Sequence, residues 1–514
     1  MGDTAARVNV PSAAETYDVV VVGAGGAGLA AAAEAARLGR SVVLLEKNPQ
    51  PGGSTSWSVG SITATNTPHQ KKAGIQDTPD AHFEDMEKHA GGLASRDNPK
   101  LRRILVDNTN DMLEWLMRLG VVFVGPMPEP PHRYNRMHNV VPNSRAFAYH
   151  LARYCRRLGV DIRVSTAARR LLTEGERVIG VETTDGAGRL RQFHARGALV
   201  LASGDYSGGR ELKAEFASPD VAAVDAVNVT NTGDGHRMAR ELGAVVLNGD
   251  IVRGPIMRFV PPTAQNFLRR LPPLRPLAAT MAWCYENLPQ SWLRPFFMGF
   301  LTTALGPSSD LYKEGAILVN QDGKRYSDEL DRPNLDTAKQ PGRIAWIVFD
   351  YNVAKKFSAW PHFVSTAPGV AYAYLDDYRR NRADIFHEAQ TVAELARSIG
   401  VPEHALAPTL ADYNASGRGP RPALEAAPYY ALGPVKSYVI FTDGGLRVTE
   451  RLEVVRADGT VIAGLYAAGA AGQGGLLLEG HGHHLGWAFI SGRIAGRNAA
   501  FDVPPRAPTS VPLH

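Results

Sequence analysis

The sequence predicts an α/β fold built around a doubly wound parallel sheet, and three observations near its start carry that prediction. An apolar strand at 19–22 runs into a glycine-rich turn. An alanine-rich helix follows the turn, and a second apolar strand at 41–45 ends in Glu46. Strand, glycine turn, helix, strand and acid in this order form a Rossmann-like dinucleotide-binding unit.

The three spaced glycines of the turn have separate roles. Gly23 permits the tight turn, Gly25 lets the backbone approach a pyrophosphate, and Gly28 lets the helix pack closely on the strand. The helix N-terminus faces the anion, and Glu46, about 20 residues on, would bind the adenosine ribose hydroxyls. A Gly/Ala-rich turn can also serve packing alone, but the complete unit predicts bound FAD or NAD(P).

Further glycine-rich stretches follow the same order as in a known group of proteins. They are Pro51-Gly52-Gly53-Ser54-Thr55, Trp57-Ser58-Val59-Gly60-Ser61, 70–86, 199–209, Thr232-Gly233-Asp234-Gly235, 315–329, Gly444-Gly445-Leu446 and Gly464-Leu465-Tyr466-Ala467-Ala468-Gly469. In these stretches the chain resembles the FAD-dependent fumarate reductase, succinate dehydrogenase and 3-ketosteroid dehydrogenase flavoproteins. The resemblance covers roughly 17–260 and 430–500, and it implies FAD as the cofactor.

The resemblance also implies a Rossmann-like FAD-binding domain of the glutathione-reductase type, interrupted by an α+β capping domain. Strand and helix patterns alternate up to about residue 260, with a helix predicted at 144–158 and a β segment at 178–200. Beyond that point the sequence is rich in proline and aromatic residues, with helical patterns at 391–399 and 408–416. We therefore predict the FAD-binding domain at 1–261 and 436–514, and the capping domain at 262–435.

By resemblance, the FAD contacts can be assigned to individual residues. Ser54 stands where covalently flavinylated relatives have histidine, so we expect non-covalent FAD. A helix from about residue 485 to 500 would point its positive end at the flavin N1/C2 carbonyl, or would simply be a packing helix. The expected FAD-binding residues are Gly23, Gly25, Gly26, Ala27, Gly28, Glu46, Lys47, Gly52, Gly53, Ser54, Thr55, Ser58, Val59, Gly60, Ala168, Ser203, Gly204, Thr232, Asp234, Gly235, Gly469, Leu485 and Gly486.

Composition excludes several other classes of protein. The chain has 514 residues, of which 44% are hydrophobic, so it can bury the cores of two or three domains. A net charge of +5, without a basic run interleaved with aromatic residues, argues against nucleic-acid binding. Two cysteines, Cys155 and Cys284, argue against a disulfide framework and an iron–sulfur site. The N-terminus has no signal-peptide pattern, and we expect a cytoplasmic protein.

The segment 267–305 is the part least like the family. It carries Trp283, Trp292, Phe296, Phe297 and Phe300, and two short apolar runs. Neither run reaches the ~18 residues of a membrane span. Three interpretations stay open: the core of the capping domain, an apolar wall or entry for the substrate, or a contact with a membrane surface or another subunit.

The chemistry that the resemblance implies is hydride transfer between a substrate carbon and flavin N5, with a side chain handling the proton on the neighbouring carbon. The family's acid follows a Gly-Lys-Arg-aromatic stretch, which here is Gly323-Lys324-Arg325-Tyr326. Arg332 is the nearest candidate, and its alternative role is a surface ion pair with Asp331 or Asp336. Tyr326 and Tyr134 are further candidates for the proton.

The run 478–486 aligns without a gap to a ketosteroid dehydrogenase pattern. By resemblance, the backbone N–H of Gly482 would donate to a substrate carbonyl and polarise it. Leu478 replaces the family's tyrosine, so His481, His483 and His484 are candidates for the second donor. Three clustered histidines are also typical of a metal site or of a purely structural cluster. We expect no metal, because no nearby cysteine completes a set of ligands.

Departures from the fumarate reductases define the expected substrate. Pro261, Phe441 and His484 stand where those enzymes place carboxylate-binding groups. Without these groups, a small dicarboxylate loses its cationic partners. We therefore expect a largely apolar carbonyl substrate that reacts at an adjacent C–C or C=C bond. An ene-reductase of a polar unsaturated acid and a non-catalytic flavin-binding partner protein are the alternatives, and no motif identifies the electron donor or acceptor.

Overall fold

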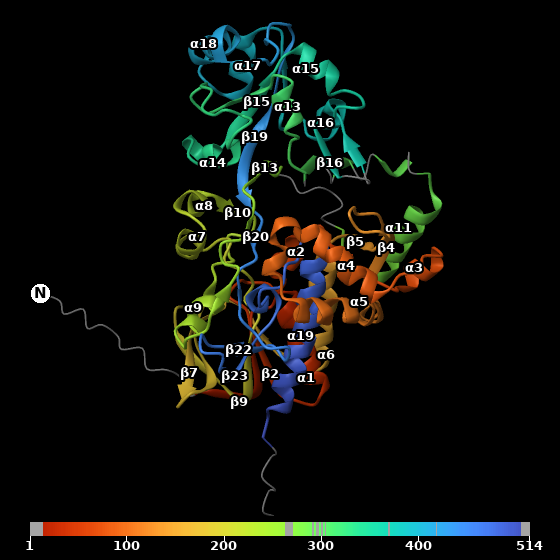
Figure 1. Ribbon diagram of the computed structural model, residues 1–514, viewed down its shortest axis with the longest axis vertical. Helices are drawn as coiled ribbons and strands as arrows, with labels where there is room; N and C mark the ends of the chain where they lie inside the picture. Colours follow the sequence, from red (N-terminus) through yellow and green to blue (C-terminus); the bar gives the residue numbers. More distant parts are fainter. Residues whose placement is uncertain are drawn as a thin grey trace, which may run out of the picture.

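A computed structural model describes residues 14–262, 271–289, 292–294, 298–299, 302–303, 305–367, 371–417 and 419–504. The chain forms two stacked parts (Figure 1). The lower part contains both ends of the described chain, and the upper part is built from its middle third. The long strand β19 (Tyr429–Val439) runs from the upper part toward the lower one.

The lower part is organised by one mixed sheet, which confirms the predicted fold class. Its strand order is β22-β23-β9-β1-β2-β6. The central pairs β1–β2, β1–β9, β2–β6 and β23–β9 are parallel, as crossover helices require. These strands are β1 (Glu15–Val22), β2 (Val42–Leu45), β6 (Asp161–Arg163), β9 (Leu190–Leu201), β22 (Glu453–Val455) and β23 (Val461–Ala467). An antiparallel meander, β7 (Thr166–Glu174) and β8 (Arg177–Asp185), continues from β9.

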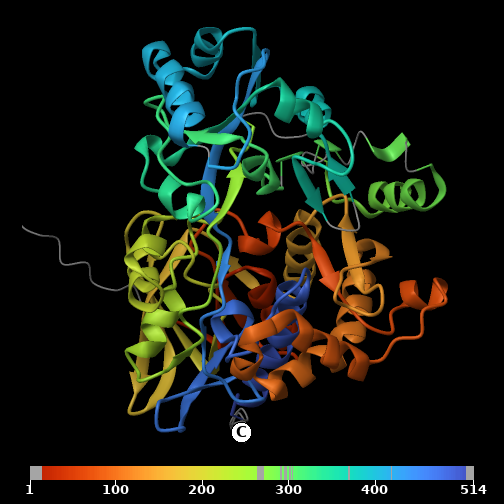
Figure 2. The ribbon, with the colours of Figure 1, turned by 45° about the horizontal axis from the view of Figure 1, so that its top comes forward.

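Helices α1 (Gly26–Arg37) and α19 (His483–Phe501) pack on this sheet and on each other, and α6 (Arg145–Arg157) packs on α1 (Figures 1 and 2). The alanines of α1 are buried, which allows α19 to approach its backbone directly. A Cβ at Gly492 would lie 2.3 Å from the carbonyl oxygen of Ala27, and one at Gly496 would lie 2.2 Å from that of Ala31. Only glycine permits this separation. Helix α1, near the start of the described chain, and helix α19, near its end, therefore form one packed unit.

The remaining elements of the lower part surround the ends of the sheet strands. They are α2 (Gly53–Trp57), β3 (Ser61–Thr63), α3 (Pro68–Lys72), α4 (Pro79–Ala90), α5 (Pro99–Leu119), β4 (Val122–Met127), β5 (Met137–Val141), α7 (Arg210–Phe216), α8 (Pro219–Ala223), α9 (Asp234–Arg240), β11 (Val246–Leu247), β12 (Val252–Arg253), β20 (Phe441–Thr442) and β21 (Gly445–Leu446). Among them, β3, β5 and β4 form a small antiparallel sheet that continues into the loop before α6.

The upper part has its own sheet, in the order β10-β19-β15-β14, with β13 and β18 also paired to β19. Its strands are β10 (Asp225–Ala226), β13 (Ile256–Phe259), β14 (Ile317–Val319), β15 (Ala345–Phe349) and β18 (Phe386–Ala389). Around it lie α13 (Asp310–Lys313), α14 (Pro333–Thr337), α15 (Tyr351–Lys356), β16 (Ser365–Ala367), β17 (Ala371–Ala373), α16 (Leu375–Asn381), α17 (Val392–Ile399) and α18 (Glu403–Asp412). Helix α11 (Arg275–Asn287) instead packs against β4 and β5 of the small sheet (Figure 1). Because β10 and β13 precede residue 262, the upper sheet takes strands from both sides of the predicted boundary.

Most predicted helices lie within two residues of the observed ones, but one prediction was wrong. The helix expected at 408–416 is α18, which begins at Glu403 and ends at Asp412. Pro408 therefore lies inside the helix and not at its start. In the aromatic segment, residues 267–270, Phe296, Phe297 and Phe300 lie outside the described residues.

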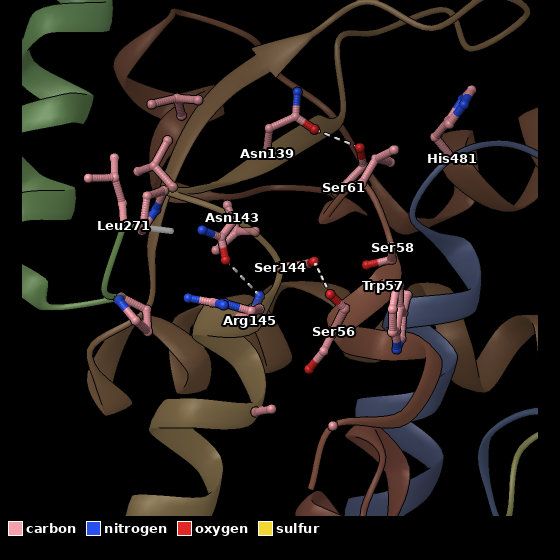
Figure 3. A pocket seen from close by; sticks show the side chains of 18 of the residues that line it. Ser56, Trp57, Ser58, Ser61, Asn139, Asn143, Ser144, Arg145, Leu271 and His481 are labelled. Atoms are coloured by element: carbon pink, nitrogen blue, oxygen red, sulfur yellow. Dashed lines mark hydrogen bonds between the residues drawn. The ribbon is translucent and has the colours of Figure 1, made fainter. Parts of the chain in front are cut away.

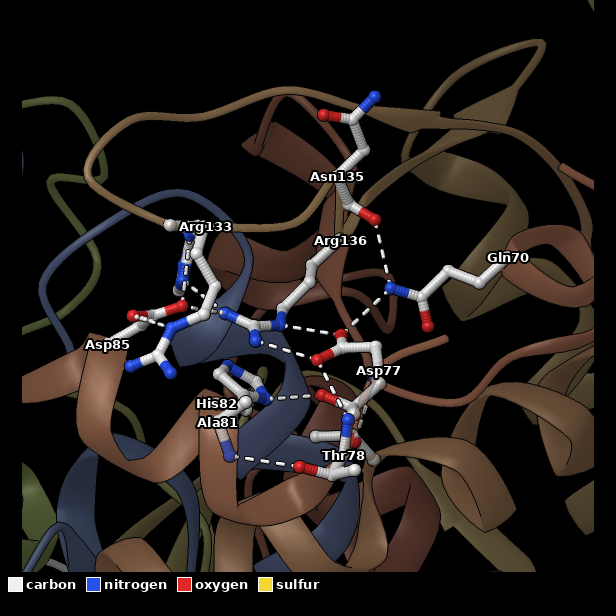
Figure 4. A network of polar contacts seen from close by, with 12 residues as sticks. Gln70, Asp77, Thr78, Ala81, His82, Asp85, Arg133, Asn135 and Arg136 are labelled. Atoms are coloured by element: carbon white, nitrogen blue, oxygen red, sulfur yellow. Dashed lines mark hydrogen bonds and ion pairs between the residues drawn. The ribbon is translucent and has the colours of Figure 1, made fainter. Parts of the chain in front are cut away.

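A buried ion-pair network joins the small sheet to α4 (Figure 4). The Arg136 guanidinium donates to both carboxylate oxygens of Asp77 and to Asp85, each at 2.7 Å. All three side chains are fully buried. Such a pair cannot lose one partner without leaving an uncompensated buried charge.

Replacement of Arg136 should therefore be costly to the fold. We expect Arg136→Met to lower the free energy of unfolding by about 3–5 kcal/mol, because Asp77 and Asp85 lose their buried counter-charge. Arg103→Met is the matched control, since Arg103 pairs with exposed acids and should cost at most ~1 kcal/mol. Urea unfolding of the two variants measures the difference, and equal losses would contradict this view of Arg136.

Candidate functional site

The glycine turn after β1 has the geometry of an anion-binding loop. Gly23 has a φ of +102°, and Gly25 caps the N-terminus of α1. A Cβ at Gly28 would lie 1.7 Å from the carbonyl oxygen of Gly23, so the helix is seated directly on the turn. A Cβ at Gly25, by contrast, would meet no protein atom within 4 Å. The turn is thus closed toward the protein at Gly28 and open at Gly25, where a pyrophosphate would approach.

Polar groups around the turn also fit a dinucleotide. The hydroxyl of Thr55 accepts from the N–H of Gly26 at 3.0 Å. The hydroxyl of Ser203 is buried and has no partner among the described residues, and a Cβ at Gly235 would lie 2.3 Å from it. A buried polar atom without a partner is the kind of group that a bound ligand satisfies.

Glu46 and Lys47 directly follow β2, and both form hydrogen bonds within the protein. The carboxylate of Glu46 accepts from the N–H groups of Ala24 and Asn48, both at 2.8 Å. Lys47 donates to Asp234 at 2.7 Å and to Thr232 at 2.8 Å. Glu46 therefore holds the glycine turn through the N–H of Ala24. Its contact with a ribose remains a prediction.

The other residues expected to bind FAD fall into two groups. The structure brings Gly52, Gly53, Ser58 and Val59 to the wall of a large cavity. Gly60 and Ser54 belong to the same stretch, and the Ser54 hydroxyl accepts from Asn228 at 2.9 Å and Asn231 at 2.8 Å. The second group lies deeper in the lower part: Ala27 on α1, Ala168 on β7, Gly204 after β9, Gly469 beside α19, and Leu485 and Gly486 in the first turn of α19.

This cavity lies between the two parts and has a volume of about 2290 Å³. On the lower side it is lined by α2, by the turn around Ser58 and by the start of α6 (Figure 3). Helix α11 supplies the apolar side chains of Leu277 and Met281 to the wall, and Leu288 follows just after the helix. One side of α11 therefore forms an apolar wall of the cavity, whereas Trp283 and Trp292 are 59% and 68% exposed.

His481 lines the cavity together with the carboxylate of Glu129. Glu129 accepts from both the backbone N–H of His481, at 2.7 Å, and its ring Nδ1, at 2.5 Å. The hydrogen bond with Glu129 raises the pKa of His481 above its usual value. The His481 side chain is 65% exposed while Glu129 is mostly buried, so the pair presents an imidazole ring to the cavity.

The neighbouring histidines point elsewhere. Nε2 of His484 lies 3.3 Å from the buried carboxylate of Asp443, and its ring packs against Phe441. His483 is fully buried and contacts His82. Gly482, which lies between His481 and His483, has a φ of +92°, and its N–H donates to no group in the described part of the chain. The local sequence therefore gives three histidines with three separate environments.

Three predicted candidates for proton transfer lie away from this cavity. Arg332 is on the surface of the upper part, with a side chain that is 63% exposed and lies 3.6 Å from Asp331. Tyr326 bonds Thr337 at 2.6 Å and lines a different, smaller cavity of the upper part. Tyr134 is partly exposed and packs beside Arg136. The structure does not bring these three side chains to the wall shared by His481 and α11.

Two residues that the sequence did not single out stand in this cavity. Glu129 lies between prolines in a loop, 352 positions from its partner His481, and no local motif marks it. Arg258 on β13 also lines the cavity, and no carboxylate pairs with it among the residues described. Burial lowers the pKa of Arg258, which is half-buried.

Comparison with known proteins agrees with this architecture. The family model described as FAD binding domain matches residues 18–257 and 281–477. A probable fumarate reductase, Ifc3, of Shewanella frigidimarina is 28% identical over 512 residues, covering 95% of this chain and 75% of the relative. A 3-oxosteroid 1-dehydrogenase of Mycolicibacterium smegmatis is 25% identical over 607 residues, covering 95% and 97%. The open conformation of a flavocytochrome c3 fumarate reductase matches with a TM-score of 0.69 and 27% identity, covering 96% of this chain and 79% of that one.

The chain belongs to the FAD binding domain family, and FAD is its cofactor. It is an FAD-dependent oxidoreductase that acts on carbon–carbon bonds, as the resemblance implied. This result excludes the alternative of a non-catalytic flavin-binding partner. Among the described residues, no helix is both long and apolar enough to cross a membrane.

The open face of Gly25 gives a direct test of the FAD cradle. We expect Gly25→Ala to fold normally, because its φ is negative and the new methyl group meets no protein atom. The methyl would occupy the approach of the pyrophosphate, and a conflict of roughly 1–3 kcal/mol would weaken FAD binding about 5- to 150-fold. FAD per chain is measured after acid release, with Gly92→Ala, also in open space, as the control. Equal FAD affinity in both variants would exclude this position for the pyrophosphate.

Proposed function

We propose that this protein oxidises or reduces a carbon–carbon bond next to a carbonyl group in a largely apolar substrate. The observation that carries the proposal is the Glu129–His481 pair at a largely apolar cavity that also borders the FAD-binding stretch 52–59. Bound FAD supplies hydride transfer at flavin N5. The residues of the chain must then bind the substrate, polarise its carbonyl and move one proton.

The proton falls to His481 in this proposal. It is the one predicted candidate that lines the cavity, and a general acid must reach the reacting carbon. Glu129 holds the ring through Nδ1, which leaves Nε2 as the atom that gives or takes the proton. A carboxylate that fixes the tautomer and stabilises the charged ring is a common way to orient a catalytic imidazole.

The carbonyl group is assigned to the loop that carries His481. The Gly482 N–H has no acceptor within the part of the chain described, and it lies one residue from the proposed acid. A Cβ at this position would lie 2.4 Å from the backbone nitrogen of Thr63 on β3, so the loop is pressed against a strand. A rigid backbone donor of this kind stabilises negative charge that develops on a carbonyl oxygen.

Apolar side chains support the proposed substrate class. Leu277 and Met281 on α11 line the cavity together with Val124 and Met127 on β4, the strand against which α11 packs. Burying apolar substrate surface against such walls contributes roughly 25 cal/mol per Å². The volume of the cavity leaves room for a multi-ring or aromatic compound next to the cofactor.

A second candidate function, reduction of an unsaturated acid, is favoured by Arg258. Its guanidinium faces the cavity from β13 without a carboxylate partner among the described residues. An arginine in this position would pair with a substrate carboxylate. Pro261 and Phe441 still replace the family's other carboxylate-binding groups, so we rank this function second.

The first test concerns His481. We expect His481→Gln to slow substrate turnover by ~10²–10⁴-fold with FAD content unchanged, because a general acid or base typically contributes that factor. His404→Gln, which removes an exposed histidine on α18, is the matched control. A loss below about threefold would return the proton to Arg332, His484, Tyr134 or Tyr326.

The pH dependence follows from the same pair. In the direction of reduction His481 must be protonated, so the rate should fall as pH rises through its raised pKa. Glu129→Gln removes the cause of that shift, and the falling limb should move to lower pH. In the direction of dehydrogenation the neutral ring acts as the base, and the rate should rise with pH instead.

The substrate class is tested by flavin absorbance in stopped flow. We compare fumarate with a bulky cyclic enone and its saturated ketone, and expect turnover with the enone or the ketone but little with fumarate. The physical reason is that a buried carboxylate without enough cationic partners costs several kcal/mol. Faster turnover of fumarate than of every apolar compound would reject the first candidate function in favour of the second.

A further inference from the structure

We propose that His82, His132 and His483 form a binding site for a divalent transition-metal ion of the zinc type. The candidate ligand nitrogens of the three rings all lie within 4.8 Å of one another. They come from α4, from the loop before β5 and from the N-terminus of α19. The sequence predicts no metal at the cluster of His481, His483 and His484. In the fold, His483 lies beside His82 and His132 instead of His481 and His484.

The spacing of the rings suits tetrahedral coordination. Nε2 of His82 and Nε2 of His483 are 3.0 Å apart. Two imidazoles bound to zinc at ~2.0–2.1 Å have their nitrogens about 3.3 Å apart, so this pair needs only a small adjustment. Both side chains are fully buried, and imidazole is a preferred ligand for zinc, copper and nickel.

A hydrogen bond between His82 and His483 would satisfy only part of the cluster. It leaves Nε2 of His132 buried without a partner, and likewise Nε2 of His89, among the described residues. The rings of His89 and His132 have centroids 4.4 Å apart. A cation would engage His82, His132 and His483 together and leave His89 or a water molecule for the fourth position.

The outer contacts of His82 and His483 are those expected behind metal ligands. Nδ1 of His483 bonds the backbone carbonyl of Glu479, and Nδ1 of His82 lies 2.8 Å from the hydroxyl of Thr65. Such contacts fix the tautomer and turn Nε2 toward the metal. Arg136 donates to Nδ1 of His132 at 2.9 Å, so metal binding through Nε2 of His132 requires the ring proton to move to Nδ1 and the Arg136 contact to open.

The charge of Arg136 does not oppose a cation at this place. Asp77 and Asp85 pair with its guanidinium at 2.7 Å, so the arginine is already compensated. The ion would join three segments that are far apart in the sequence. His483 directly follows Gly482, and His132 lies three residues after Glu129, the partner of His481. The metal would therefore fix the position of the loop that carries His481 and Gly482.

The test measures zinc in holoenzyme made without a histidine tag. After zinc loading and dialysis, we expect about one zinc per chain, with X-ray absorption showing nitrogen ligands at ~2.0–2.1 Å. His82→Ala and His132→Ala should each retain at least ~10-fold less zinc. His69→Ala is the matched control, because His69 also has a buried, unpartnered ring nitrogen but lies outside the three-ring set.

Two results would overturn the proposal. One is less than about a tenth of a zinc per chain in the loaded wild type, and the other is equal zinc in the wild type and both ligand variants. FAD content reports whether each variant has folded. If a ligand variant loses its FAD, the X-ray absorption spectrum of the wild type decides alone: three or more imidazole ligands support the site, and their absence rejects it.

Discussion

The close contact between α19 and α1 is the constraint on which the rest of the structure depends. Gly492 and Gly496 place one helix backbone directly on the other, at a separation that no side chain allows. This contact fixes the C-terminal segment beside the first βαβ unit. It thereby fixes the loop at 479–483, which supplies a ring to the cavity, a ring to the buried cluster and the free N–H of Gly482. The cavity and the cofactor turn are held together because Gly492 and Gly496, near the end of the described chain, lie directly on Ala27 and Ala31 of α1.

The loop before α19 and the first turn of that helix place three histidines, His481, His483 and His484, in three different environments. Gly480 and Gly482 both have positive φ, +87° and +92°, and each reverses the local direction of the chain. As a result His481 meets Glu129, His483 meets His82, and His484 meets Asp443. Only the first of these faces the cavity. A regular helix or strand would have repeated the same environment every second or fourth residue instead.

The FAD-binding half of this protein could be predicted from sequence because it depends on local patterns. The other half could not, because it depends on contacts between residues that are far apart in the sequence. The glycine turn, β1, α1 and α19 depend on neighbours within a few residues, so their sequence signals were sufficient. The partner of His481 could not be predicted, because Glu129 reaches it from a loop with no periodicity. Arg332 was assigned by its distance from a motif, which does not determine on which face of the upper part a side chain lies. The His82–His132–His483 set shares no spacing in sequence at all.

The two cysteines of the chain differ in accessibility, and this difference allows one of them to be labelled selectively. The thiol of Cys155 is buried and donates to the carbonyl of Leu29, and burial raises its pKa to about 12, so it is chemically inert. Cys284 lies on α11 and lines the cavity. An alkylating reagent therefore has one target, placed where the substrate is expected. The rate of alkylation of Cys284 therefore reports whether the cavity is occupied. A single fluorophore at Cys284 would follow movement of α11 relative to the FAD-binding part, without any engineered residue.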